Sequence, residues 1–468
     1  MLTSLLLTTA ITSAGQPPAG YYPPGVLPTR PVPVQMAPRG AYQVVQQTPP
    51  GTLPMTAQPA PMPTTQKGDG KDFPGTESPT EQPQDKEAEE DKGPPQKYLF
   101  ERTIEGTRFG EILNNRGIRI YGWTELGYNA STASGSNAPV FENDRANEFQ
   151  LNQNYVVLEK AIDSSKDEFQ WGWRTDWILP GTDARTTVVR GLWDVQLRNN
   201  NGGPQLYPID LFQAYGEVYL PGIGQGTTVR LGRFATHCGY ELVQAVDTPF
   251  VSRSYMFQYN PFTHTGVWAL TKLSDDWTVG YGLATGTDTF LDAPTNRPTF
   301  LGNIKWAPKD GDTSIAFSTV VTNPNFIPSE NFQLYNFYGF VVTHKVSEKL
   351  TYVLDTAYSH MGNFSTDNGD GTRNQVGFVN WYGAANYLIY AHTDTLASTL
   401  RAEVFEDAQG ARTGFKGLYT ELTYGVAWKP CPGLICRPYA RYDNNNRTQV
   451  WEGSQNLFTG GLDVILRW

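Results

Sequence analysis

Sixteen short segments between Ile118 and the end of the chain alternate apolar and polar side chains, and this rhythm constrains the fold more than any other feature. In WTVGYGLA (277–284), for example, the Trp, Val, Tyr and Leu side chains share one face, and small or polar residues take the other. A period of two predicts β-strands that have two different surroundings. The predicted strands are Ile118–Ala130, Phe149–Ala161, Phe169–Leu179, Leu211–Leu220, Thr227–Phe234, Thr263–Leu273, Trp277–Ala284, Thr299–Trp306, Thr313–Val321, Leu334–Val346, Leu350–Ser359, Asn380–Ala391, Leu396–Phe405, Gly417–Trp428, Leu434–Tyr442 and Phe458–Trp468.

The connections between these segments alternate between long and short. Long connections include Pro180–Asp210, Ala235–Phe262 and His360–Val379, and short ones include Ser274–Asp276 and Ser347–Lys349. Membrane barrels have long outer loops and tight periplasmic turns, whereas soluble sandwiches and propellers have no reason to alternate in this way. Both ends of the barrel then lie on the short-turn side, which requires an even number of strands. We therefore predict an all-β fold, a transmembrane antiparallel β-barrel of about 16 strands, within a range of about 14 to 18.

The last predicted strand, Phe458–Trp468, reads FTGGLDVILRW and must pair with Ile118–Ala130 to close the barrel. Its apolar face is predicted to meet lipid and its polar face to meet the lumen. The lipid-facing residues are Leu462, Val464, Leu466 and Trp468, and the lumen-facing residues are Asp463 and Arg467. Trp468 also resembles the terminal aromatic signal that barrel-assembly machinery recognises. We predict that it acts as an assembly signal at the periplasmic interface.

Composition favours strands over helices. Hydrophobic residues make up 39% of the chain and aromatic residues 13%, and no apolar run is long enough for a transmembrane helix, which needs about 18 residues or more. Aromatic residues near segment ends fit the interface girdles of membrane barrels; they are Trp171, Trp277, Trp306, Tyr390, Trp428 and Trp468. The formal net charge of −10 gives no basic footprint for a nucleic acid.

Three regions are expected along the chain: a leader at 1–15, a linker at 16–100 and the barrel at 101–468. Met1–Ala14 is apolar and resembles an export signal, but it lacks a positive n-region, so it is either a degenerate signal or preceded by further residues. The linker is rich in Pro and Gln and has too little apolar surface to offset chain entropy. We predict a disordered arm that is either a spacer or a cell-wall contact.

Three stretches of the barrel region resemble a known family. RLGRF (230–234), HCGYE (237–241) and SRSYMFQYNPFTHTG (252–266) are similar to the putative β-barrel porin-2 (OmpL-like) family, and the resemblance covers about Gly117 to Trp468. It implies a bacterial outer-membrane porin that gives passive diffusion of small hydrophilic solutes or ions, with no catalytic residues and no cofactor. The implied partners are the lipid bilayer and the barrel-assembly machinery, and a homotrimer is expected by analogy with general porins.

In general porins, the third outer loop folds into the barrel and forms the constriction, and here that loop lies between Phe234 and Gly266. Acidic loop residues facing basic wall residues would create a transverse field that selects ions. The loop candidates are Glu241, Asp247 and Arg253, and the wall candidates are Arg119, Arg401, Arg437, Arg441 and Arg467. The alternative is that these charges form structural salt bridges that anchor the loop to the wall.

Cysteine and histidine give weaker signals. His237 and Cys238, taken with Glu241, lack a third soft ligand in the sequence, so no metal is predicted. Cys431 and Cys436 flank a predicted periplasmic turn, where an oxidising compartment permits a disulfide.

Two other functions are kept open beside the porin. One is a structural or adhesion protein with a plugged lumen, whose arm binds the cell wall. The other is a hydrolase built on a barrel, although no nucleophile elbow is present. Single-channel conductance separates the porin from both.

Overall fold

The structure is a computed structural model, and it describes residues 97–189, 191–197, 205–291, 297–309, 311–322, 335–367 and 373–468. The predicted leader and nearly all of the predicted linker lie outside these residues. The helices are α1 (Leu99–Ile104), α2 (Arg108–Asn115), α3 (Ala184–Thr187), η1 (Asp194–Leu197), η2 (Ala245–Asp247) and α4 (Tyr255–Gln258). The strands are β1 (Arg119–Ser131), β2 (Glu148–Lys160), β3 (Gln170–Ile178), β4 (Asp210–Leu220), β5 (Thr227–Ala235), β6 (Thr263–Lys272), β7 (Trp277–Ala284), β8 (Thr299–Trp306), β9 (Thr313–Val321), β10 (Asn336–Ser347), β11 (Leu350–Asp367), β12 (Arg373–Thr393), β13 (Leu396–Asp407), β14 (Gly417–Cys431), β15 (Leu434–Asn445) and β16 (Asn456–Arg467).

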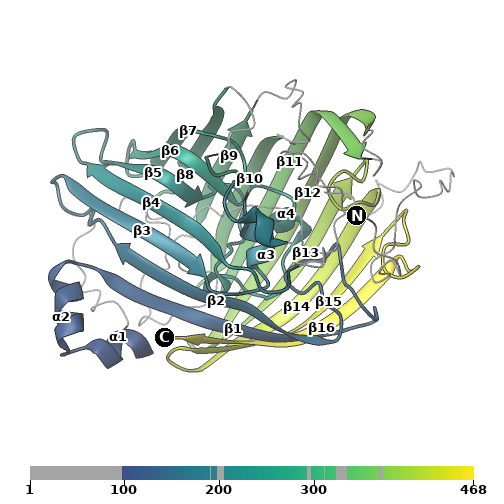
Figure 1. Ribbon diagram of the computed structural model, residues 1–468, viewed down its shortest axis with the longest axis horizontal. Helices are drawn as coiled ribbons and strands as arrows, with labels where there is room; N and C mark the ends of the chain where they lie inside the picture. Colours follow the sequence, from purple (N-terminus) through teal and green to yellow (C-terminus); the bar gives the residue numbers. More distant parts are fainter. Residues whose placement is uncertain are drawn as a thin grey trace.

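The sixteen strands form one closed antiparallel barrel (Figure 1). Each strand pairs with its neighbours in sequence, and β1 pairs with β16, with Trp123 opposite Arg467 and Ser131 opposite Thr459. This closure pairs the backbone N–H and C=O groups of both edge strands. Such pairing is required within a bilayer, because the hydrocarbon core offers no hydrogen-bond partners. The predicted fold class, strand number and closing pair are confirmed.

The hairpin of β11 and β12 departs from the prediction. The segment His360–Val379 was predicted to be a long loop, but pairing continues beyond His360 and Asn380 as far as Asp367 opposite Arg373. The prediction was wrong because it relied on apolar alternation. Each strand of a hairpin provides the hydrogen-bond partners of the other, so the pairing can continue through residues that do not alternate regularly.

Two short helices precede the barrel, and the sequence pattern did not predict them. In α2 the Thr107 side chain accepts a hydrogen bond from the Gly110 N–H, which caps the helix. In α1, Phe100 packs edge-on against Trp468 with ring centroids 6.4 Å apart. The two helices therefore lie at the end of the barrel where β16 finishes (Figure 1). No helix among the described residues is long and apolar enough to cross a membrane.

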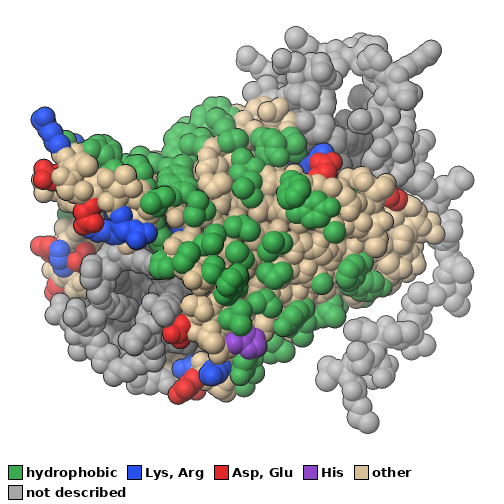
Figure 2. Space-filling view, turned by 90° about the horizontal axis from the view of Figure 1, so that it is seen from below, with side chains coloured by type: hydrophobic (Ala, Val, Ile, Leu, Met, Phe, Trp, Pro, Cys, Tyr) green, Lys and Arg blue, Asp and Glu red, His purple; other side chains and the backbone are tan. Residues whose placement is uncertain are grey.

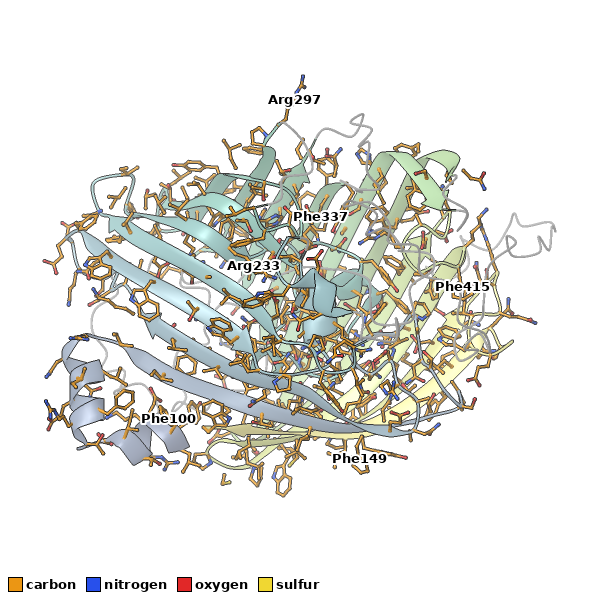
Figure 3. The ribbon with its side chains drawn as sticks, viewed as in Figure 1. Phe100, Phe149, Arg233, Arg297, Phe337 and Phe415 are labelled. Atoms are coloured by element: carbon orange, nitrogen blue, oxygen red, sulfur yellow. The ribbon has the colours of Figure 1, made fainter. Side chains whose placement is uncertain are left out.

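The outer surface of the barrel is apolar. Hydrophobic side chains spread over the middle of the face in Figure 2, and charged side chains gather toward its edges. In β16 the predicted lipid-facing Leu462 and Leu466 are 45% and 48% exposed, whereas Asp463 is fully buried. Phe149 is 80% exposed and points away from the barrel, and Arg233 lies within it (Figure 3). Period-two alternation thus separates a lipid-facing band from a polar interior.

Most of the predicted aromatic girdle is exposed at the short-turn end of the barrel. Trp171, Trp277, Tyr390 and Trp428 are 40–55% exposed. Trp171 also lies under the Lys160 ammonium, which is 3.4 Å from the ring centroid. Amphipathic rings at this level suit the boundary between hydrocarbon and water.

Candidate functional site

The third outer loop, residues 236–262, runs from β5 to β6 and lies inside the barrel. All of its residues are buried except His237 and Asp247, which are half-buried. Its short helix α4 packs against β11, β12 and β13. Ser254 caps α4 by accepting from the Phe257 N–H, and the carboxylate of Glu403 on β13 accepts from the Tyr255 and Met256 N–H groups. These hydrogen bonds pair the first backbone N–H groups of α4, which have no acceptor within the helix.

Arg401 on β13 joins the loop to the wall. Its guanidinium donates to Glu241 of the loop at 2.6 Å and to the carbonyl oxygen of Ser252 at 2.9 Å. The same side chain pairs with Glu421 on β14 at 3.1 Å. Glu241 in turn accepts from the N–H of Ser254 at 3.0 Å. The predicted meeting of an acidic loop residue with a basic wall residue therefore occurs here, as a direct ion pair.

Two further arginines on β15 hold the loop backbone. Arg441 forms a two-point pair with Asp443 and donates to the carbonyl oxygen of Arg253 at 2.6 Å. Arg437 donates to the carbonyl oxygens of Ala245 at 2.7 Å and Thr248 at 2.6 Å. Guanidinium groups have five donors in a fixed fork, so one arginine can bind a carboxylate and the loop backbone together.

The loop is also tied to the first outer loop, residues 132–147. Arg253 donates to the carboxylate of Glu142 and to the carbonyl oxygen of Val243. Tyr259 donates to the carbonyl oxygen of Pro139 at 2.9 Å. Burial raises the pKa of Glu142 to about 7, although Arg253 beside it acts in the opposite direction. Both loops thus share one buried polar network inside the barrel.

The structure brings some of the predicted charges together and separates others. Five of them lie in the buried network: Glu241, Arg253, Arg401, Arg437 and Arg441. Asp247 lies on η2 and is half-buried. The five network residues are at most 3% exposed, so in this structure they are packed against the loop rather than facing an aqueous surface. This arrangement fits the anchoring alternative.

Arg119 and Arg467 lie apart from this network. Arg119 pairs with Glu101 of α1 at 3.1 Å, and Arg467 stacks over the Tyr98 ring at 4.1 Å from its centroid. Both contacts are with the segment that precedes β1. The sequence placed these two arginines on inward faces but could not show that the helical segment would cover them.

Several acidic partners were missed at the level of sequence. They are Glu125, Glu142, Glu403, Glu421 and Asp443, all of them at most 4% exposed. Alternation places Glu421 on the face opposite the lipid-facing residues of its strand, so the sequence did indicate that this carboxylate faces the lumen. Asp443 lies two residues from Arg441 on the same strand. For the other four carboxylates, alternation could not show which guanidinium each one meets, because their partners lie on other strands or in other loops.

The three cysteines are free thiols in the structure, with Cys238 buried and Cys431 exposed. The strand register sets Cys431 opposite Leu434 and Cys436 opposite Trp428, so the two cysteines of the predicted disulfide are not opposite one another. The disulfide stays a prediction, which mass mapping under non-reducing conditions tests.

The premise that His237 and Cys238 lack a third soft ligand is wrong. His264, at the start of β6, lies beside them: one ligand atom from each of the three residues lies within 4.8 Å of the others. His264 is 26 positions beyond Cys238 in the sequence, as the two residue numbers show. The antiparallel pairing of β5 with β6 brings the two ends of the loop together, and local spacing gives no sign of this.

A closed sixteen-stranded antiparallel barrel with an apolar outer band and a polar, charge-rich interior defines a transmembrane β-barrel of the bacterial outer membrane. The sequence profile of the family described as "Putative beta-barrel porin-2, OmpL-like" matches residues 117–467. The chain belongs to this family of outer-membrane porins. The resemblance seen in the sequence is thereby confirmed, and so is the outer-membrane location.

Several solved structures are similar to this chain. The anion-selective porin from Comamonas acidovorans has 9% identity and a TM-score of 0.47, over 75% of this chain and 99% of that one. The outer membrane channel DcaP of Acinetobacter baumannii has 11% identity and a TM-score of 0.46, over 75% and 97%. OprB of Pseudomonas putida has 11% identity and a TM-score of 0.45, over 77% and 96%. No curated protein matches the chain.

Proposed function

We propose that the protein gives passive diffusion of small hydrophilic solutes or ions through its barrel, with the third outer loop as the constriction. The observation that carries the proposal is the attachment of this loop to the lumen wall. Arg401, Arg437 and Arg441 each donate to a backbone carbonyl oxygen of the loop. A barrel of sixteen strands is wide enough for an aqueous channel, and a loop fixed inside it narrows that channel.

The network also bears on selectivity. Glu241 and Arg401 neutralise one another at 2.6 Å, so their joint field in the lumen is weaker than that of separated charges. Pore width and the charges outside this network are then expected to set ion preference. The net charge of −10 for the whole chain favours cations.

Single-channel recording in a planar bilayer tests the proposal. The folded wild-type barrel, selected by its heat-modifiable mobility, is expected to give ohmic steps. The double variant Arg401→Met with Arg441→Met removes two attachments of the loop, so its steps should be larger or should fluctuate. Arg447→Met is the matched control, because Arg447 lies exposed in an outer loop. Wild-type barrel that folds and inserts but gives no steps would refute conduction.

One observation favours a second function, that of a structural protein with a plugged lumen. The first outer loop is buried over most of its length beside the third, with Val140 and Asn137 fully buried. Two loops packed against one another reduce the open cross-section. If the wild type gives no steps while the double variant conducts, the loops are a plug and the structural role is supported.

A further inference from the structure

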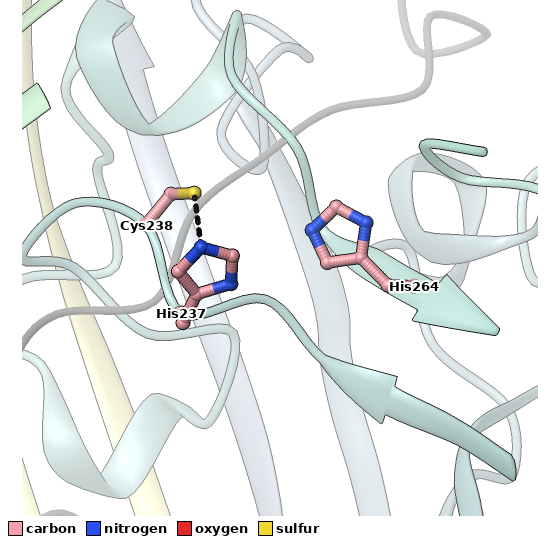
Figure 4. A group of neighbouring side chains, drawn as sticks. All are labelled: His237, Cys238 and His264. Carbon is pink, nitrogen blue, oxygen red and sulfur yellow. Dashed lines mark hydrogen bonds between the residues drawn. The ribbon is translucent and has the colours of Figure 1, made fainter. Parts of the chain in front are cut away.

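Three soft or borderline donors converge at the root of the third outer loop. His237 and Cys238 lie just after β5, and His264 lies in β6, which follows the loop. The Sγ atom of Cys238 is 3.8 Å from Nε2 of His237, and the two imidazole rings have centroids 5.8 Å apart (Figure 4). Tetrahedral zinc holds nitrogen ligands at about 2.0–2.1 Å and sulfur at about 2.3 Å. Donors within 4.8 Å of one another therefore need only a small contraction to share one ion.

Backbone carbonyl groups orient both histidines as ligands. Nε2 of His237 lies 3.0 Å from the carbonyl oxygen of Gly302 and 3.2 Å from that of Thr319, so this nitrogen carries the proton. Nδ1 of His237 then has the lone pair, and it is a buried atom with no hydrogen-bond partner among the described residues. The expected ligand atom is therefore Nδ1, and the 3.8 Å contact of the thiol with Nε2 shows only that the thiol lies beside this ring. Metal-bound histidines commonly donate their other ring N–H to a carbonyl in this manner.

His264 shows the same arrangement. Its Nδ1 lies 3.2 Å from the carbonyl oxygen of Gly286, which assigns the proton to that nitrogen. Its Nε2 lies 2.9 Å from the Thr236 hydroxyl, a rotatable group that an ion can displace. In Figure 4 the two rings face one another across the space beside the thiol. Each histidine is thus held with one lone pair free of any carbonyl contact.

The electrostatic surroundings favour a cation. The carboxylates of Asp288 and Asp355 both act electrostatically on the Cys238 side chain. Oδ1 of Asp355 is a further buried oxygen without a hydrogen-bond partner among the described residues. Because His237 is half-buried, its side of the cluster is the expected path for an ion.

We propose that His237, Cys238 and His264 bind one late transition-metal cation of the zinc class. Two neutral imidazoles and one thiolate form a donor set that suits Zn²⁺ and Cu⁺ better than Mg²⁺ or Ca²⁺. On binding, the S–H bond of Cys238 breaks, its proton passes to solvent, and a bond forms between Sγ and the metal. The ion joins the two ends of the third outer loop and fixes the root of that loop to β6. The site does not depend on conduction.

Metal titration of the full chain in detergent tests this site. Metal-free wild type is expected to bind one equivalent of Zn²⁺, and Co²⁺ in its place should give a thiolate-to-cobalt absorption band. Cys238→Ser should remove that band and weaken Zn²⁺ binding by about tenfold or more. Cys431→Ser and His392→Gln alter a cysteine and a histidine near short turns at the other end of the barrel, and both should bind like wild type.

A second measurement needs no variant. Zn²⁺ should slow the alkylation of Cys238 by a small thiol reagent at least tenfold and leave the exposed Cys431 unaffected, with both sites read by mass mapping. The proposal is overturned if wild type binds no Zn²⁺. It is equally overturned if Cys238→Ser or His264→Gln folds and binds Zn²⁺ as tightly as wild type, or if alkylation of Cys238 is unchanged by the metal.

Discussion

Arg437 on β15 donates to Glu125 on β1 at 2.7 Å, and the closing strand β16 lies between them. The same guanidinium pairs with Asp463 on β16 at 2.6 Å. One buried side chain therefore links three consecutive strands across the seam where the two ends of the barrel meet. Because it also holds the loop backbone at Ala245 and Thr248, closure of the barrel and placement of the loop depend on the same residue.

Replacing Arg437 by Met should destabilise the folded barrel by about 3–5 kcal/mol, because Glu125 and Asp463 would remain buried without a cation. Urea unfolding in detergent, followed by tryptophan fluorescence, measures this change. The exposed Arg447→Met should stay within about 0.5 kcal/mol of wild type. If Arg437→Met lowered the unfolding free energy no more than Arg447→Met does, the buried network would contribute little to stability.

Asp288 should make stability depend on pH. Its carboxylate accepts from the Phe262 and Thr263 N–H groups at 2.9 and 2.8 Å, and burial raises its pKa to about 7. The unfolded value is about 3.9, so the folded state binds the proton more tightly. Its contribution to stability is full below about pH 4 and is lost as pH rises to about 7, by up to about 1.4 kcal/mol per pH unit.

Comparison of Asp288→Asn with wild type isolates this group from other buried carboxyls. Unfolding free energies are measured from about pH 4 to about pH 8, a range that spans the unfolded and folded pKa values of Asp288. The decline over this range should be smaller for the variant than for wild type. Asp275→Asn is the control, because the Asp275 side chain is 78% exposed. Parallel curves for wild type and Asp288→Asn would contradict the prediction.

Deleting Trp468 should impair assembly in the outer membrane. The backbone N–H of Trp468 donates to the carbonyl oxygen of Gly122 at 2.8 Å, and its indole N–H donates to the Thr124 hydroxyl at 3.2 Å. The fraction of heat-modifiable barrel in outer-membrane preparations measures assembly. Trp468→Phe keeps an aromatic ring at this position and should assemble far better than the deletion. Normal assembly of the deletion variant would exclude Trp468 as an assembly signal.

Two glycines in adjacent strands should respond differently to alanine. Gly232 has φ +136°, and a Cβ added there would lie 2.2 Å from the carbonyl oxygen of Ala214. Gly232→Ala should therefore cost about 1–3 kcal/mol of unfolding free energy. An added Cβ at Gly216 meets nothing within 4 Å, so Gly216→Ala should change stability by less than about 1 kcal/mol. Denaturant midpoints compare the two, and similar values would count against a strained backbone at Gly232.

The hairpin of β11 and β12 shows where sequence patterns stop being informative. Alternation located both strands within the membrane, as Leu350–Ser359 and Asn380–Ala391, because lipid on one side and a polar lumen on the other force a period of two. Beyond these segments both strands continue through a mixture of polar residues and apolar ones such as Met361, Phe364 and Phe378. There each strand is maintained by hydrogen bonds to its partner, and the pairing does not need a regular alternation along both strands.

The amino-acid pattern was sufficient to predict the barrel, the number of strands, the closing pair of β1 with β16 and the outward residues of β16. All of these follow from local alternation and from the lengths of connections, which are properties of neighbouring residues. The contact of Arg401 with Glu241 and that of His264 with His237 and Cys238 are seen only in the folded barrel. These contacts join residues that are distant in sequence, and only barrel closure and the path of the loop through the lumen fix which of them become neighbours.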